Sequence, residues 1–294
     1  MIYPILRESR VVIEYEGRAF TMDALSSFSG STSYGEYKSL RKTIHNRSNY
    51  AYSKIVQQEP SSISIQTPFT MGGVEGLLLH LLGWDTDKIP YEMPKFNRSV
   101  TPKMFNIYLC FKELDYICFT NCYLSAMDIV LEKSVPSISL GFESGNFYEG
   151  TYPPQGSMIQ GDVMPFYPVS VLYDNTETPG LVSASISLQQ QCEWIDNRSI
   201  HSIGTIYSNS QAYVRELNVS ATVSTYMVSR LSGQSVLLPE YAPITIRNNI
   251  FSLNIPLARI TKRADFSDVF KLEYDIIPTE DSDPVTISFM EKIR

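Results

Sequence analysis

The chain of 294 residues carries little charge, and acidic residues outnumber basic ones. Charged residues make up 19% of it, whereas about a quarter is typical of soluble domains. Low charge beside 43% hydrophobic residues suggests that part of the surface is covered in an assembly. The net charge of −7 and the lack of a Lys/Arg cluster argue against a protein that grips nucleic acid. An acidic wall is still compatible with DNA that slides past it.

Long apolar runs are also missing. No stretch approaches the roughly 18 apolar residues of a transmembrane helix. Residues 1–10 contain no apolar core of signal-peptide length. We therefore expect a protein that has no membrane-spanning segment and is assembled in the cytoplasm.

Recognisable catalytic and metal-binding motifs are absent. The sequence has no Gly-x-Ser-x-Gly nucleophile motif, and the acidic runs at 85–87 and 280–283 lack the rest of a calcium-binding loop. The three histidines are read as packing or loop-docking positions. The four cysteines, which have no zinc or redox spacing, are expected to be buried reduced thiols: Cys110, Cys118, Cys122 and Cys192. We expect no enzyme, no cofactor and no metal.

Strand-forming residues are abundant. The chain contains 19 Tyr and 14 Phe, and apolar and polar residues alternate with a period of two in residues 62–67, 137–142, 218–223 and 270–275. Such alternation buries one face of a strand and leaves the other polar. Residues 74–82 are instead almost continuously apolar, lack β-branched residues after Val74 and lie between glycines, which predicts one short helix.

The two halves of the chain share an order of features, which indicates an internal repeat. In each half an acidic residue followed by a large aromatic precedes an Arg and an Ile-His pair. Two spacings are identical: 13 residues from Tyr15 to Phe28 and from Tyr173 to Ile186, and 18 from His45 to Ile63 and from His201 to Val219. Gly and Pro punctuate the region between the halves. We expect a first domain at 1–148, a linker at 149–168 and a second domain, without a strong helix, at 169–294.

These features together resemble the tail-tube domain of long-tailed phages. They are an aromatic residue in the first strand (Tyr15, Tyr173), a Ser/Thr-rich second strand, a long polar loop (34–59, 192–216), a strand pair with a short helix, and a closing Ser-x-hydrophobic strand at 137–143. The resemblance covers most of the chain. It implies a mainly β fold of two tandem antiparallel β-sandwich or β-barrel domains. It leaves open whether the chain is a main tube subunit or a tube-initiating, baseplate-proximal relative.

The resemblance also implies a function: a structural virion protein that forms rings and stacks them into a tail tube, the conduit for DNA ejection. Three copies of a duplicated chain would supply six domains to a ring. The implied partners are other copies of the chain, tape-measure and baseplate proteins and, where the tail has one, a sheath. DNA would pass without specific binding.

The two polar loops are the expected subunit contacts. They combine aromatic and arginine side chains, which dominate protein interfaces; the residues we single out are Tyr34, Tyr37, Arg41, Arg47, Tyr50, Trp194, Arg198 and Arg215. Interleaved basic and aromatic residues can also bind single-stranded nucleic acid, but the acids Glu36 and Glu59 in the first loop favour a protein interface. Two other classes stay open at this point. One is a baseplate adhesion or carbohydrate-binding β-sandwich, and the other is an enzyme whose paired carboxylates are distant in sequence.

Overall fold

The structure is a computed structural model of the chain. It describes residues 9–22, 26–40, 51–70, 73–95, 99–111, 115–132, 135–158, 168–196, 208–226, 240–265, 271–279 and 283–289. Within these ranges the chain forms strands and one helix, α1 (Val74–Leu81), which lies where the sequence predicted it. The prediction of a mainly β chain is confirmed.

The strands follow one another in this order: β1 (Arg10–Tyr15), β2 (Arg18–Met22), β3 (Ser27–Ser31), β4 (Tyr34–Leu40), β5 (Ala51–Gln58), β6 (Ser61–Pro68), β7 (Tyr91–Glu92), β8 (Phe105–Phe111), β9 (Asp115–Leu131), β10 (Ser137–Thr151), β11 (Ser157–Met158), β12 (Ser170–Tyr173), β13 (Thr176–Glu177), β14 (Leu181–Trp194), β15 (Ala212–Tyr226), β16 (Tyr241–Arg247), β17 (Phe251–Asp265), β18 (Lys271–Pro278) and β19 (Thr286–Phe289). All four segments with alternating patterns lie within or largely within strands. Strand β10 runs two residues past the predicted start of the linker at 149.

Two groups of strands have the same order of neighbours. In the first strand group the order is β3-β6-β10-β9-β8-β1-β2, all antiparallel, and β11 adds to β2 in parallel. In the second strand group it is β14-β15-β18-β17-β16-β12-β13, again antiparallel. Taken along the chain, each of the seven antiparallel strands of the first group has a counterpart in the second that pairs with the matching neighbours.

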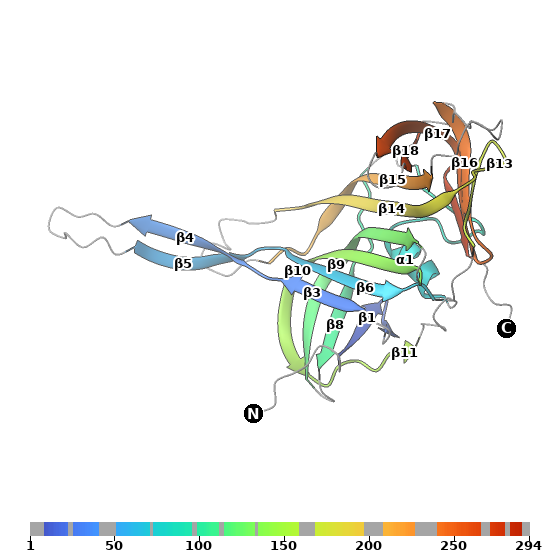
Figure 1. Ribbon diagram of the computed structural model, residues 1–294. Helices are drawn as coiled ribbons and strands as arrows, with labels where there is room; N and C mark the ends of the chain where they lie inside the picture. Colours follow the sequence, from blue (N-terminus) through green and yellow to red (C-terminus); the bar gives the residue numbers. More distant parts are fainter. Residues whose placement is uncertain are drawn as a thin grey trace.

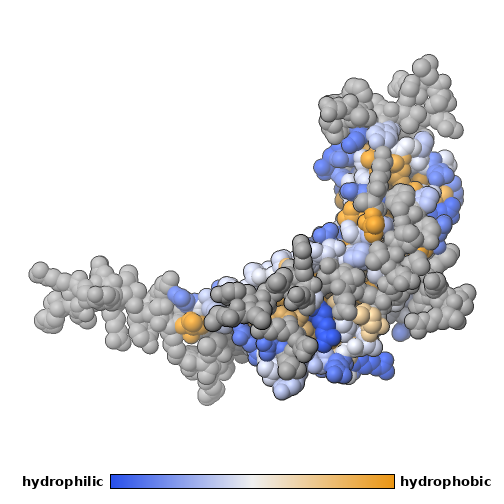
Figure 2. Space-filling model, turned by 60° about the horizontal axis from the view of Figure 1, so that its bottom comes forward, coloured by the Kyte–Doolittle hydropathy of each residue, from blue (hydrophilic) through white to orange (hydrophobic). Residues whose placement is uncertain are grey.

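The groups are joined edge to edge. Residues 184–189 of β14 pair antiparallel with residues 126–131 of β9, beyond the point where β8 stops pairing with β9. This junction makes seventeen strands part of one sheet. Figures 1 and 2 show the result as a bent molecule, with the second strand group set at an angle to the first.

A second link between the groups uses the end of the chain. Strand β19 pairs with β17 of the second group and with β7, which follows α1 in the first half. Four aromatic rings gather around this link, with centroids 5.6–6.2 Å apart along the contacts: Phe69, Tyr91, Phe251 and Phe289. Aromatic pairs at such distances add about 0.5–1.5 kcal/mol each beyond their buried area. The angle between the groups is thus held at two places.

One buried cluster extends through both groups and includes α1. An isolated helix shorter than ~12 residues is marginal in water, so α1 depends on this packing. Leu78, Leu79 and Leu81 are completely buried, and each buried leucine contributes about 1.5–3 kcal/mol. Gly73 is the N-cap that precedes the helix, and its left-handed φ of +58° costs a glycine little.

The cysteines have no disulfide partners. Cys110, Cys118 and Cys122 are buried, as predicted, whereas Cys192 is only half-buried. Burial raises the pKa of the Cys122 thiol to about 12, which keeps it protonated and unreactive. In the part of the chain that the structure describes, no helix is long and apolar enough to cross a membrane.

Candidate assembly surfaces

Strands β4 and β5 form an arm that projects from the body. They pair only with each other, in a separate two-stranded sheet with a bulge between Gly35 and Glu36. Figure 1 shows the arm extending well beyond the first strand group. Two arm side chains that the structure describes are largely exposed, Tyr34 at 46% and Ile55 at 41%. A two-stranded sheet is only marginally stable alone, so we expect contacts with other proteins to stabilise the arm.

Polar and aromatic contacts lie at the base of the arm. The Ser33 hydroxyl donates to the Glu59 carboxylate at 2.5 Å, and the Glu59 amide donates to the Ser33 carbonyl at 3.0 Å. The ring of Tyr34 lies 6.2 Å from that of Phe147 in β10. The first two contacts hold the two segments together at the base of the arm, and the ring contact joins Tyr34 to the main sheet.

The arm contains the first set of predicted contact residues. Tyr34 is 46% exposed at its base, and Tyr37 pairs with Lys54 further along it. Arg41, Arg47 and Tyr50 lie outside the described residues. The sequence predicted a loop at 34–59, whereas most of its described part is strand. The difference has a physical reason, because the two segments satisfy each other's backbone hydrogen-bonding groups in an antiparallel ladder.

The second predicted loop, 192–216, also begins and ends in strands. Strand β14 continues to Trp194, and β15 begins at Ala212, opposite it. Arg198 lies outside the described residues. In Figure 1 this end of the β14–β15 ribbon points toward the same side of the molecule as the arm.

Trp194 is anchored within the chain. Its indole N–H donates to the Glu143 carboxylate at 3.0 Å, and the Tyr123 hydroxyl donates to the same oxygen at 2.5 Å. The rings of Tyr123 and Trp194 have centroids 5.3 Å apart. Burial and this hydrogen bond raise the pKa of Tyr123 well above its ordinary value, so the phenol stays a donor. Trp194 therefore packs one strand group against the other, and only part of its surface faces outward.

Sequence reasoning did not identify Glu143 and Tyr123. The alternation in β10 places Glu143 on the polar face with Ser139 and Gly141, and the pairing of β10 with β9 places Tyr123 opposite it. An acid at the end of an alternating strand was the only available signal. Its partner comes from a strand 51 residues later in the sequence.

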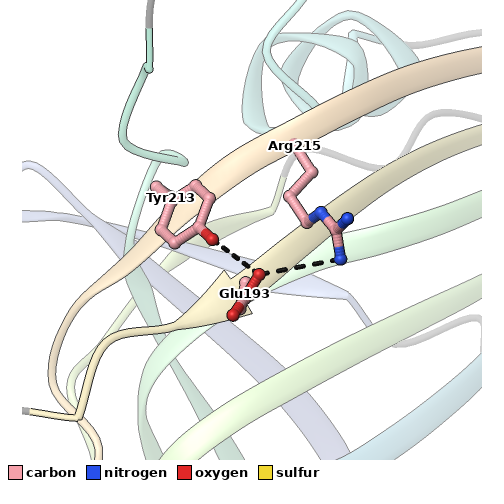
Figure 3. Close-up of polar contacts among 3 residues, drawn as sticks. All are labelled: Glu193, Tyr213 and Arg215. Atoms are coloured by element: carbon pink, nitrogen blue, oxygen red, sulfur yellow. Dashed lines mark hydrogen bonds and ion pairs between the residues drawn. The ribbon is translucent and has the colours of Figure 1, made fainter.

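Arg215 is exposed and lies near Glu193, the residue before Trp194. The Glu193 carboxylate accepts a hydrogen bond from the Tyr213 hydroxyl at 2.6 Å and lies 3.6 Å from the Arg215 guanidinium (Figure 3). The hydrogen bond to Glu193 raises the pKa of Tyr213. The side chains of Arg215 and Glu193 are 65% and 52% exposed, and such exposed ion pairs contribute little to folding. The trio can therefore exchange partners with another protein at small cost.

His80 occupies a partly buried polar site at the end of α1. Its Nδ1 lies 2.9 Å from the Thr86 hydroxyl, and the Lys103 ammonium is 2.8 Å from its Nε2. Burial and the Lys103 charge lower the pKa of His80 below 6.5. The neutral ring can accept a hydrogen bond from the ammonium, whereas a protonated ring would repel it.

The lowered pKa predicts loss of stability in mild acid. Between the folded pKa and about 6.5 the unfolded chain binds more protons than the folded one, so stability falls as pH drops through about 6.5 toward the folded pKa. In His80→Gln the melting temperature should fall less over this range. Because His45 and His201 stay unchanged, the difference between variant and parent reports His80 alone. Parallel melting curves would show that its protonation is not linked to folding.

Comparison with known proteins identifies the family. A family model described as the Bacteriophage Baseplate Tube Protein Family matches residues 1–294. The chain is 44% identical over 293 residues to the "Baseplate tube protein p140" of Escherichia phage T5, with 98% of each chain covered. Both findings confirm the resemblance to phage tail-tube proteins and the predicted place in the virion tail. The chain belongs to the bacteriophage baseplate tube protein family.

Proposed function

We propose that the chain forms rings that stack into the baseplate end of a phage tail tube, a conduit for DNA. The observation that carries this proposal is the β9–β14 junction, where two strand groups with the same pairing order meet edge to edge. A subunit that joins such groups laterally within one chain can join them between chains by the same geometry. Repetition of one junction around an axis closes a ring.

We also propose that the strand groups are copies of one domain, with the boundaries expected from the sequence: 1–148, 149–168 and 169–294. The matching order of seven strands supports this, because independent sheets would not repeat every neighbour in chain order. Three chains would then supply six similar units. Ring closure would remove exposed strand edges, which otherwise promote aggregation.

The charge balance supports a passive conduit. With a net charge of −7, the assembled wall repels the DNA backbone on average, so DNA would slide through without specific contacts. The role is structural and not catalytic. The proposed partners are further copies of the chain, other baseplate proteins, the tape-measure protein and, where the tail has one, a sheath. The name of the T5 relative favours a position at the baseplate over one along the main tube.

Negative-stain electron microscopy over a range of protein concentrations tests this function. We expect rings and short hollow tubes of one width, which become more frequent as concentration rises. Compact single particles at every concentration would contradict ring formation. They would favour an adhesion module, which glycan binding would then test.

A further inference from the structure

Lys103 lies in the polar site at the end of α1, and the proposed conduit makes no use of it. The residue is half-buried, whereas Lys88, in the loop that follows α1, is exposed. The Lys103 ammonium nitrogen lies 2.8 Å from Nε2 of His80 and 2.9 Å from its Nδ1. Such a lysine has exchanged part of its water for a partner that can take its proton.

Hydrogen bonds around His80 select one form of its ring. The Thr86 hydroxyl lies 2.9 Å from Nδ1, and the Tyr15 hydroxyl lies 3.4 Å from Nε2. Burial raises the pKa of Tyr15 to about 12, so its hydroxyl stays a donor. A neutral imidazole has one N–H donor and one acceptor nitrogen. The form that fits these partners donates from Nδ1 to Thr86 and leaves the lone pair of Nε2 for Lys103.

Burial favours the uncharged forms of both side chains. It lowers the pKa of Lys103 below its ordinary value, more than the carboxylates of Glu16, Asp85 and Asp87 raise it. Burial and the Lys103 charge lower the pKa of His80, so at pH 7 the ring is neutral and can accept a proton. The free amine is the nucleophilic form of a lysine. A larger fraction of it is therefore present here at neutral pH than in a solvated lysine.

The three side chains form a series of nucleophile, base and orienting group. An activated nucleophile lies within about 2.6–3.2 Å of its base, and a third group orients the base. Lys103, His80 and Thr86 meet this condition at 2.8 Å and 2.9 Å. They come from the segment before β8, from α1 and from the loop after it. The arrangement thus depends on how α1 packs against the first strand group.

We propose that Lys103 is an acylation site whose amine reacts with uncharged thioesters, with His80 as the base. The ammonium passes one proton to Nε2 of His80, and the amine nitrogen forms a bond to the carbonyl carbon of the thioester. The carbon–sulfur bond breaks, and the sulfur leaves with the electron pair and takes a second proton from the nitrogen. The products are an Nε-acyl-lysine, a thiol and an imidazolium, which returns its proton to water.

Charge around the site selects the electrophile. The carboxylates of Glu16, Asp85 and Asp87 act on Lys103 and would repel an anionic donor such as an acyl phosphate. An uncharged thioester meets no such repulsion. Acylation would remove the positive charge of Lys103, which is one of the two causes that lower the pKa of His80. The acylated protein should therefore be less sensitive to mild acid than the unmodified one.

Brief acetylation with S-phenyl thioacetate, a small uncharged thioester, tests the site. The full-length protein is treated until a small fraction of each lysine has reacted, and peptide mass spectrometry gives the rates at Lys103 and Lys88. Lys88 is the internal reference, because it is exposed beside Asp87. At pH 7 we expect Lys103 to react about tenfold faster, less than the roughly hundredfold that a base can contribute, because burial slows the approach of the thioester. Equal rates at pH 7 would overturn the proposal.

The pH profile gives an independent measurement on the unchanged protein. Toward about pH 10 ordinary lysines also lose their protons, so the ratio of the two rates should fall. A ratio that stays constant from pH 7 to this range would mean that the Lys103 amine is no freer than that of Lys88 at neutral pH, and would contradict the proposal.

Two positions separate the base from burial alone. His80→Gln retains a hydrogen-bonding side chain that cannot take the proton, so the preference for Lys103 should be lost. Thr86→Val should weaken the preference and Thr86→Ser should retain it, because serine keeps the hydroxyl that orients the ring. Circular dichroism checks that each variant folds. An unchanged preference in folded His80→Gln would reject His80 as the base; if that variant does not fold, the pH profile of the parent decides.

Discussion

Deletion of residues 41–52 should abolish stacking of rings into tubes while sparing folding and ring formation. The deleted segment runs from the end of β4 to the second residue of β5, and these two strands form a sheet separate from the seventeen-stranded one. Lys38 and Ser53 are paired across the two strands of the arm. The deletion would therefore leave Ser39 and Leu40 as a two-residue hairpin loop. Changing these two residues to Asn-Gly would favour the tight turn that such a loop needs.

Tube length in electron micrographs and the melting temperature are the two measurements for this variant. Single rings with an unchanged melting temperature are expected, since a long arm reaching the next ring is what stacking would require. The full-length chain with Ser39→Asn and Leu40→Gly is the matched control, and it should still stack. If the deleted protein forms tubes of ordinary length, the arm has another role.

Gly145→Ala should cause the largest loss of stability from a single methyl group. A Cβ at Gly145 would overlap the carbonyl oxygen of Asn209, lie 2.7 Å from its carbonyl carbon and meet the ring of Trp194 at 3.2 Å. The colliding atoms belong to the backbone of Asn209. The amide of Asn209 donates a hydrogen bond to the carbonyl of Gly145 at 3.2 Å, so the two backbones are held together. Overpacking of this kind costs about 1–3 kcal/mol, and a backbone neighbour cannot turn aside as a side chain can.

Urea denaturation followed by tryptophan fluorescence measures this effect. We expect a lower midpoint of unfolding. We also expect a red shift of the fluorescence before unfolding, because Trp194 would lose its hydrogen bond to Glu143 and become more exposed. The other tryptophan, Trp84, is 2% exposed in the core and should not contribute to the shift. Gly30→Ala is the control, since its nearest neighbours would lie 3.7 Å from the new Cβ. Equal midpoints for the two variants would mean that residues around 209 do not pack on β10 in solution.

The sequence by itself determined the local structure. Period-two alternation in residues 62–67 and 137–142 places Ile65 and Leu140 in the core, because successive side chains of a strand point to opposite faces. The apolar run after Gly73 lacks β-branched residues beyond Val74 and lies between glycines, which was enough to predict α1. The order of features along both halves sufficed to predict the phage tail-tube resemblance, which the family match confirms.

Only the tertiary structure decided which strands meet and what holds them. The pairing of Ile129 in β9 with Ile186 in β14 depends on an edge of β9 left open by the shorter β8, which no local pattern along the chain indicates. The polar contact of Glu143 with Trp194 likewise joins residues 51 positions apart. The sequence placed Trp194 and Arg215 in one polar loop without separating their roles. In the structure the Trp194 side chain packs against Tyr123 and Glu143, whereas the Arg215 side chain is exposed. The burial of a side chain depends on neighbours that are remote in the chain, which the sequence does not show.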